Sequence, residues 1–461
     1  MSVEGAAARY GLPRGVRYRA MFAVVLAVFI SVLDYAVTNV ALPTIARELH
    51  VTSSQSIWAI NVYQLAALAL LFPVSALGSR VGYARMCCIG ITLFLVASTL
   101  AAFTSSLLTL TLARALQGAG SACIMGVNLA LIRFIYPQHT IGKGIALNSF
   151  ALGLGVACGP SIGSAVLALA SWRWIYLINL PLDLIALTLA LTSLPKTPLS
   201  EQRLDLKAIA LSALALTLTV IGLDALVHGG GISAMGLTAL GLICGVMLVR
   251  REKFSQFRIV PTDILPIPRI FVAFICGNLV YIASNLFIIA LPFTLEAVFN
   301  RSPSEVGLLI TPWALSISIM SFVIGKWTDR LPAAQICAFG LFLMGSAFLL
   351  LWLLPESASN FSIAWRVAIG GCGFGLFHPP NNRVLMVATP QGREGGASGL
   401  VSVERLGGQT MGALCVAAIF RLSGHETTIC LLAASVIAFA GSILSLGREY
   451  LISLGERTRS A

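Results

Sequence analysis

Residues 20–43 read AMFAVVLAVFISVLDYAVTNVALP, an apolar run that contains a single carboxylate, Asp34. A stretch of about 20 apolar residues is long enough to cross the hydrocarbon core of a bilayer as a helix. A charged side chain near the middle of such a helix costs roughly 2.5 to 3.5 kcal/mol, so it normally faces a partner, a cavity or a transported species. The run therefore predicts a membrane helix in which Asp34 is the leading site candidate.

The composition extends this interpretation to the whole chain. Of the 461 residues, 57% are hydrophobic and 10% are charged, which is too apolar for a soluble globule. The alternating pattern of a membrane β-barrel does not compete with the long apolar runs. We therefore expect an all-α polytopic membrane protein with fourteen transmembrane helices. They are predicted at residues 20–42, 57–77, 86–103, 107–131, 144–169, 175–194, 207–227, 232–249, 269–292, 306–326, 334–354, 362–380, 397–420 and 428–447.

Basic residues in the short loops indicate the orientation of the chain. Most of the 30 lysines and arginines fall on the termini and on the loops after even-numbered helices, which the positive-inside rule assigns to the cytoplasm. We expect two cytoplasmic termini, an uncleaved first helix and a bacterial inner or plasma membrane. The net charge of +12 is spread over these segments, so it predicts contact with anionic lipid rather than nucleic acid.

The ten cysteines lie in or beside apolar runs without a CxxC motif. This distribution is typical of packing residues and predicts neither a metal site nor a disulfide framework.

Two polar segments, 195–206 and 250–268, divide the predicted helices into six, two and six. The flanking sets repeat motifs: Arg80 and Arg330 follow the second helix of each set, and Arg114 and Arg366 lie in the fourth. Repeated six-helix bundles are a recurring transporter architecture, with the substrate site between the bundles. The chain is thus predicted to have five parts. They are a cytoplasmic tail (1–19), an N-terminal six-helix bundle (20–194), linkers with two extra helices (195–268), a C-terminal six-helix bundle (269–447) and a second cytoplasmic tail (448–461).

The fifth predicted helix carries small residues at spacings of three and four, Gly155, Gly159 and Gly163, together with Pro160. Small residues on one helical face allow close backbone approach, and proline removes a helix hydrogen bond. The motif predicts a hinge between bundles that rock, and the alternative is ordinary tight packing.

Four motifs in order resemble those of a known family. The helix-5 glycines, the sequence RALQGAG from Arg114, and Leu33-Asp34 with Asn39 and ALP at 41–43 resemble the antiporter motif of the major facilitator superfamily. The sequence WRWIYLINLP at 172–181 resembles the signature of its fourteen-helix drug:proton antiporter branch. The resemblance runs from about residue 20 to 447.

The resemblance implies a proton-driven exporter of lipophilic cations, such as quaternary ammonium compounds and dyes, with no cofactor. Residues of helices 1, 4 and 5 would couple the two flows. The loop after helix 2, with Arg80, would act as a gate, and its second copy holds Asp329 and Arg330. The family usually has aspartate where this chain has Ser79, so the gate is expected to be asymmetric.

The predicted depth of the ionisable residues in the membrane is an independent argument that they form one site. At about 1.5 Å per residue, Asp34 and Arg114 both lie roughly 10 to 13 Å below the outer surface, and Asp183 falls in the same layer. If Asp34 faces Arg114, the opposite charge and desolvation act in opposite directions on its proton affinity. A proton and a bound cation would then compete for one carboxylate, which is the chemistry of exchange. The alternative is a buried structural pair.

Further candidates are less specific. Glu404, next to Arg405, is a second intramembrane acid for proton coupling, although such acids also serve as ion-pair ties between helices. Aromatic rings that could stack on a cation, and amides that could contact substrate or join helices, complete the set. These residues are Tyr35, Tyr63, Phe287 and Trp313, and Asn61 and Gln64.

The main rival function is a related transporter of a metabolite or a noncationic solute, because family resemblance sets the fold better than the substrate. An enzyme is disfavoured, since no nucleophile with its base, metal cluster or phosphate loop has usable spacing. The paired halves also disfavour a channel. The expected partners are protons, lipid and a small lipophilic cation, and we expect a monomer.

Overall fold

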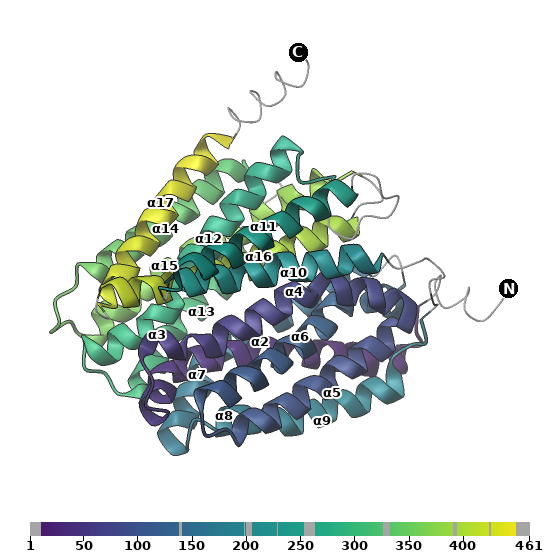
Figure 1. Cartoon of the computed structure of the whole chain (residues 1–461), viewed down its shortest axis with the longest axis horizontal. Coiled ribbons are helices and arrows are strands. Elements are labelled where there is room, and N and C mark those ends of the chain that lie inside the picture. The colour runs from purple at the N-terminus through teal and green to yellow at the C-terminus, as the bar shows by residue number, and fades with distance from the viewer. Residues whose placement is uncertain are drawn as a thin grey trace, which may run out of the picture. The chain divides into compact units, whose positions relative to one another are not determined.

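The computed structural model describes residues 11–137, 141–197, 199, 205–227, 229–252, 263–325, 332–390, 394–423 and 426–448. Throughout this part of the chain the regular secondary structure is helical, as expected from the composition (Figure 1). The helices form two compact units, which are described separately below.

The N-terminal unit contains the helices up to residue 193, apart from the short helix at Ser53–Ser56, and most of the next two. They are α2 (Arg14–Glu48), α4 (Trp58–Val81), α5 (Tyr83–Ala102), α6 (Leu107–Ile135), α7 (Ile141–Leu169), α8 (Trp174–Leu177), α9 (Asn179–Ser193), α10 (Leu206–Val227) and α11 (Gly231–Glu252). The predicted separation of 195–268 from the first bundle stays a prediction.

The C-terminal unit contains the remaining helices and the short α3. They are α3 (Ser53–Ser56), α12 (Pro268–Ala297), α13 (Pro303–Gly325), α14 (Ala333–Trp352), α15 (Asn360–Val387), α16 (Glu394–Leu422) and α17 (Thr428–Leu446).

The predicted count of fourteen membrane spans is not confirmed. Twelve helices among the described residues are long and apolar enough to cross a membrane. The predicted helices at 362–380 and 397–420 are present as α15 and α16, with 28 and 29 residues. They fall outside the twelve because their sequences interrupt the apolar run with several glycines and with charged or polar side chains such as Arg366, His378, Glu404 and Arg405.

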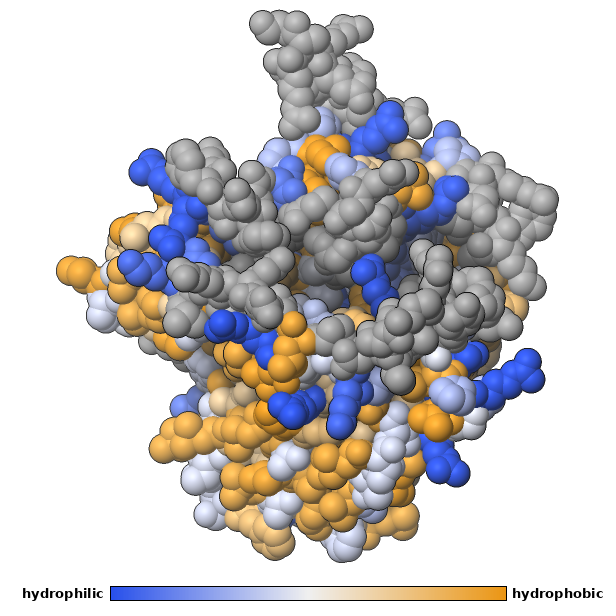
Figure 2. Space-filling model, turned by 90° about the vertical axis from the view of Figure 1, so that its right-hand side faces the viewer, coloured by the Kyte–Doolittle hydropathy of each residue, from blue (hydrophilic) through white to orange (hydrophobic). Residues whose placement is uncertain are grey.

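Much of the outer surface suits contact with lipid. Large apolar side chains near the junction of α5 and α6 are exposed, including Leu100, Phe103 and Leu108. On the face drawn in Figure 2, hydrophobic side chains dominate the lower part of the view. Because such a surface would be costly in water, it agrees with helices that are immersed in a bilayer.

Each unit contains a helix pair whose backbones touch through two glycines. A β-carbon on Gly90 of α5 would lie 2.9 Å from the carbonyl oxygen of Gly120 on α6, and one on Gly120 would lie 2.8 Å from that of Gly90. Gly340 of α14 and Gly373 of α15 approach each other in the same way, at 2.6 and 2.4 Å. The internal repeat inferred from loop motifs therefore extends to the packing of corresponding helices.

The glycine motif of the fifth predicted helix packs α7 tightly on α2. A β-carbon on Gly159 would lie 2.3 Å from the β-carbon of Ala36, and one on Gly155 would lie 3.1 Å from the backbone of Phe29. Gly163 leaves slightly more room, 3.3 Å from Val37. Pro160 lies inside the helix. Close packing accounts for these contacts, and the hinge role stays a prediction.

We predict that Gly159→Ala destabilises the protein whereas Gly153→Ala, on the same helix, does not. The first substitution forces a methyl group into Ala36, and overpacking of this kind costs about 1–3 kcal/mol. A β-carbon on Gly153 meets no atom within 4 Å. Thermal unfolding of the purified variants in detergent measures the difference, and equal melting temperatures would contradict the packing role of Gly159.

Candidate functional site

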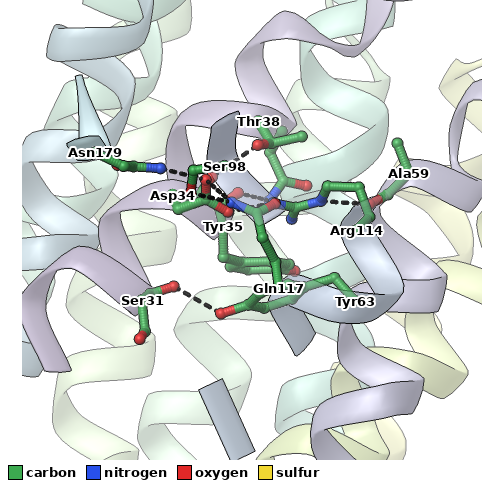
Figure 3. A network of polar contacts seen from close by, with 11 residues as sticks. Ser31, Asp34, Tyr35, Thr38, Ala59, Tyr63, Ser98, Arg114, Gln117 and Asn179 are labelled. Atoms are coloured by element: carbon green, nitrogen blue, oxygen red, sulfur yellow. Dashed lines mark hydrogen bonds and ion pairs between the residues drawn. The ribbon is translucent and has the colours of Figure 1, made fainter. Parts of the chain in front are cut away.

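Asp34 and Arg114 form a buried ion pair within the N-terminal unit (Figure 3). Asp34 lies in the middle of α2 and Arg114 in the first third of α6, and their side chains are completely inaccessible to solvent. Arg114 donates from one terminal nitrogen to Asp34 Oδ2. The structure thus brings together the two residues that were assigned to one layer by depth.

Three further contacts fix the guanidinium group. Its Nε donates to the carbonyl oxygen of Ala59 on α4 at 2.8 Å, and a terminal nitrogen donates to Gln117 Oε1 at 2.8 Å. The ring of Tyr63 lies against it, with 4.4 Å between the guanidinium carbon and the ring centroid. Arg114 therefore ties α6 to α2 and α4 through one rigid group, which a flexible ammonium group would not do.

The second carboxylate oxygen of Asp34 is also occupied. Gln117 Nε2 donates to Oδ1 at 3.2 Å, and Asn179 Nδ2 of α9 donates to the same oxygen at 2.8 Å. Gln117 in turn donates to Ser98 Oγ on α5 at 2.8 Å. In Figure 3, Asn179 approaches Asp34 from one side and Arg114 from the other. Donors from α6 and α9 thus stabilise the ionised carboxylate.

Asp183 places a second acid beside this pair. It lies on α9, one helical turn after Asn179, and it is 1% exposed. It interacts electrostatically with Asp34, and within the described residues its Oδ2 atom has no hydrogen-bond partner. Two carboxylates that share a low-dielectric region are not readily ionised together. The cluster of two acids and one arginine can therefore hold an exchangeable positive charge.

The candidate substrate residues of α2 and α4 are two tyrosines, which contact other side chains or the backbone, and two buried amides. Tyr35 and Tyr63 stack, with 6.5 Å between ring centroids, and the Tyr63 hydroxyl donates to the carbonyl oxygen of Ser31 at 2.9 Å. Asn61 and Gln64 are each 1% exposed. No atom of either amide has a hydrogen-bond partner among the described residues. These two side chains thus have unused hydrogen-bonding capacity.

Phe287 and Trp313 belong to the C-terminal unit. Phe287, Trp313 and Phe348 form a cluster of three rings, with centroids 4.8 Å apart for Phe287 and Trp313, 4.6 Å for Phe287 and Phe348, and 5.9 Å for Trp313 and Phe348. The backbone of Trp313 also packs against Gly371, because a β-carbon on Gly371 would lie 2.4 Å from the carbonyl oxygen of Trp313. In this conformation the two rings are packed against other aromatic side chains, and their role in substrate binding stays a prediction.

Glu404 lies in a separate polar cluster of the C-terminal unit. It is 1% exposed, and Oε1 accepts a hydrogen bond from Asn381 of α15 at 3.3 Å. The carboxylate fills the space beside Gly277, where a β-carbon would collide with it. Arg448, beyond the end of α17, interacts electrostatically with Glu404, and burial lowers the pKa of this arginine. Proton coupling through Glu404 stays a prediction.

The residues predicted to form the gate lie partly outside the described chain. Arg80 is exposed in the last turn of α4, and the Ser79 hydroxyl donates to the carbonyl oxygen of Ala76 at 2.7 Å. Asp329 and Arg330 lie outside the described residues.

Sequence reasoning missed three of the polar groups around the ion pair. Gln117 and Asn179 occur within the motifs quoted above, but the motif alone does not tell which side chains face Asp34. Ser98 carries no sequence signal, because a serine inside an apolar helix is commonplace.

The sequence matches the Major Facilitator Superfamily over residues 24–261 and 273–453. The chain belongs to this superfamily. It is 40% identical over 440 residues to the uncharacterized transporter YebQ of Escherichia coli K12, covering 94% of this chain and 96% of that protein. The superfamily assignment makes the chain a multi-span membrane transporter.

More distant major facilitator relatives include the riboflavin transporter RibZ of Clostridioides difficile, at 28% identity over 83% of each chain. The multidrug efflux pump LfrA of Mycolicibacterium smegmatis is 27% identical over 87% of this chain and 80% of its own. The crystal structure of the peptide transporter POT in complex with sulfate superposes with a TM-score of 0.70, at 13% identity, covering 94% and 95% of the two chains. This last similarity shows the fold alone.

We predict that Arg114→Lys is far more destabilising than Arg366→Lys, its counterpart in the second half of this major facilitator protein. Lysine cannot contact Asp34, Gln117 and Ala59 from one planar group, and each lost bond to a charged group is worth about 1.5–3 kcal/mol. Arg366 bonds Ser362 of its own helix and stacks on Trp365, so we expect a loss of under about 1 kcal/mol there. Denaturant unfolding in mixed micelles measures both, and equal losses would contradict the assigned geometry.

Proposed function

We propose that this transporter exports lipophilic, cationic drugs in exchange for protons, as a member of the fourteen-helix drug:proton antiporter branch. The observation that carries the proposal is the buried Asp34 carboxylate, which accepts hydrogen bonds from Arg114, Gln117 and Asn179. A carboxylate held in this way can exchange one positive partner for another. The proposal places the protein in a bacterial inner membrane as a monomer with cytoplasmic termini.

The exchange follows from charge balance at Asp34. Removing one partner of a buried ion pair typically costs about 3–5 kcal/mol, because the remaining charge is left uncompensated. If a conformational change withdraws Arg114, Asp34 must bind another positive charge. A proton neutralises the carboxylate, whereas a bound organic cation favours its ionised form. The two therefore compete for Asp34, and alternating access turns this competition into coupled transport.

Asp183 supports the proposal as a second proton acceptor. It interacts electrostatically with Asp34, and its buried Oδ2 atom has no hydrogen-bond partner in the part of the chain that the structure describes. When a cation occupies Asp34, its positive charge also reduces the repulsion between the two acids, so proton release from either acid becomes easier. The pair would then titrate as a unit rather than as separate sites.

The relatives named as efflux pumps favour a drug substrate, and LfrA is described as a multidrug efflux pump. A second candidate is export or import of a metabolite or another noncationic solute. The amides of Asn61 and Gln64, which have no hydrogen-bond partner among the residues that the structure describes, favour it, because a quaternary ammonium ion offers them no hydrogen bond. The riboflavin transporter RibZ is a relative with a polar, heteroaromatic substrate.

We predict that inverted vesicles containing the protein accumulate ethidium when a pH gradient is imposed, and that Asp34→Asn abolishes this accumulation. Asparagine removes the titrating group, so neither proton binding nor competition remains. A voltage of 100 mV changes the free energy of moving one elementary charge across the membrane by about 2.3 kcal/mol. An exchange of one proton for one monovalent cation moves no net charge, and a voltage alone should then have no effect.

The matched control is Glu305→Gln, which neutralises a partly exposed acid in the first turn of α13, in the C-terminal unit, and should leave accumulation unchanged. Retained pH-driven accumulation in folded, inserted Asp34→Asn would refute the role of Asp34. If the wild type instead takes up riboflavin and not ethidium under the same gradient, the noncationic alternative replaces the drug substrate.

A further inference from the structure

Residues 172–179 connect the Glu48 end of the N-terminal unit to its buried ion pair. Trp172 Nε1 donates to Glu48 Oε2 at 2.8 Å, at the last residue of α2. Arg173 reaches the same carboxylate at 3.4 Å and the carbonyl oxygen of Thr104 at 3.2 Å. Its guanidinium carbon lies 4.6 Å from the ring of Trp172. The start of the segment is thus anchored to the end of α2 and to the turn after α5.

The middle of the segment lies directly beside the arginine of the pair. Tyr176 of α8 is completely buried, packs edge-on against Trp172 at 6.1 Å between centroids, and lies 5.8 Å from the guanidinium carbon of Arg114. α8 is four residues long, and α9 begins two residues after it, at Asn179. This short connection leaves little freedom between the anchored tryptophan and the amide of Asn179.

Asn179 differs from the other donors to Asp34. Arg114 and Gln117 both belong to α6, and Gln117 is held at both ends, by Arg114 and by Ser98. Asn179 comes from α9, and within the described part of the chain its side-chain bond is the one to Asp34. An amide donates through nitrogen and accepts through oxygen. Asn179 can therefore donate to the ionised carboxylate and, after a flip of its amide, accept from the protonated one.

We propose that Asn179 is a positioning residue that sets the proton affinity of Asp34, and that the anchored segment 172–176 holds it in place. The proposal rests on the proposed function, in which Asp34 exchanges a proton. Loss of the Asn179 amide removes a donor that stabilises the anion, so Asp34 retains its proton to higher pH. Because the donor is on α9, a movement of α9 relative to α2 changes the proton affinity without any movement of Arg114.

Other groups near Asp34 do not duplicate this role. The titratable groups that interact electrostatically with it are Arg114, Asp183 and Tyr176. α4 contributes Tyr63 beside the arginine, and α5 contributes the neutral Ser98. α7 faces α2 with the glycines described above. Asn179 is thus the neutral group from outside α6 that bonds the carboxylate in the described structure.

The test is a pH titration of the purified protein followed by infrared difference spectroscopy. The signal is the carbonyl band of a protonated carboxyl group that disappears in Asp34→Asn, and it requires no substrate. In Asn179→Leu, which has a similar shape and no hydrogen bond, we expect the midpoint of this band to move upward by about one pH unit or more. Trp172→Phe, which keeps an aromatic ring and loses the hydrogen bond to Glu48, should move the midpoint in the same direction by a smaller amount.

The matched control is Asn128→Leu. Asn128 of α6 donates to Asn148 of α7 at 2.7 Å and is likewise buried, but it does not contact Asp34. Its loss should lower thermal stability without moving the midpoint. Should Asn179→Leu fail to fold, Asn179→Asp serves instead, and its added carboxylate should also raise the midpoint.

An unchanged midpoint in the folded Asn179 variant, or an equal shift in Asn128→Leu, would overturn the proposal. The vesicle experiment on the wild type is separate. If ethidium uptake fails while the infrared midpoint moves as expected, the drug substrate is wrong and the positioning role remains. If uptake is driven by the pH gradient but the midpoint does not move, the role of Asn179 is wrong and the proposed function remains.

Discussion

The N-terminal unit is organised around one constraint, the need to compensate two opposite charges that are fully removed from solvent. Asp34 and Arg114 meet this need only if several helices keep a fixed arrangement. α2 supplies the carboxylate, α6 the guanidinium group, α4 a carbonyl oxygen through Ala59, and α9 an amide. A shift of any of these helices exposes a charge or an unpaired donor to an apolar surrounding, which is costly. The ion pair is thus a structural tie between these helices.

Sequence reasoning placed the three ionisable residues of the candidate site in one layer, and the reason is physical. An ionisable residue inside an apolar run is rare enough to stand out, and the constant rise of a helix converts residue number into depth. Asp34, Arg114 and Asp183 were found in this way, and the structure brings all three together. Ser98 and Asn179 could not be found, because the rotation of a helix about its axis depends on packing with its neighbours.

For the fold, too, some features could be predicted from the sequence and others could not. The positions of the helices could be predicted from the apolar runs. The number of membrane spans is harder to predict, as α15 and α16 show. Helices that carry several glycines and polar or charged side chains lose the apolar character by which a span is recognised. The reciprocal glycines of α5 and α6, and of α14 and α15, were also not foreseen, since glycine is frequent in all membrane helices. The two halves resemble each other in this packing and differ in the contacts of the corresponding arginines, because Arg366 bonds its own helix whereas Arg114 joins α6 to α2 and α4.

The glycine pairs restrict how such a protein can move. Where two backbones touch, there is no intervening layer of side chains that could change rotamers and let one helix slide past the other. Each of these pairs must therefore move as a single rigid element. Deformation is left to contacts lined by larger, adaptable side chains and to hydrogen bonds between helices. For a carrier that works by changing shape, the smallest residues thus decide which parts of the molecule stay unchanged.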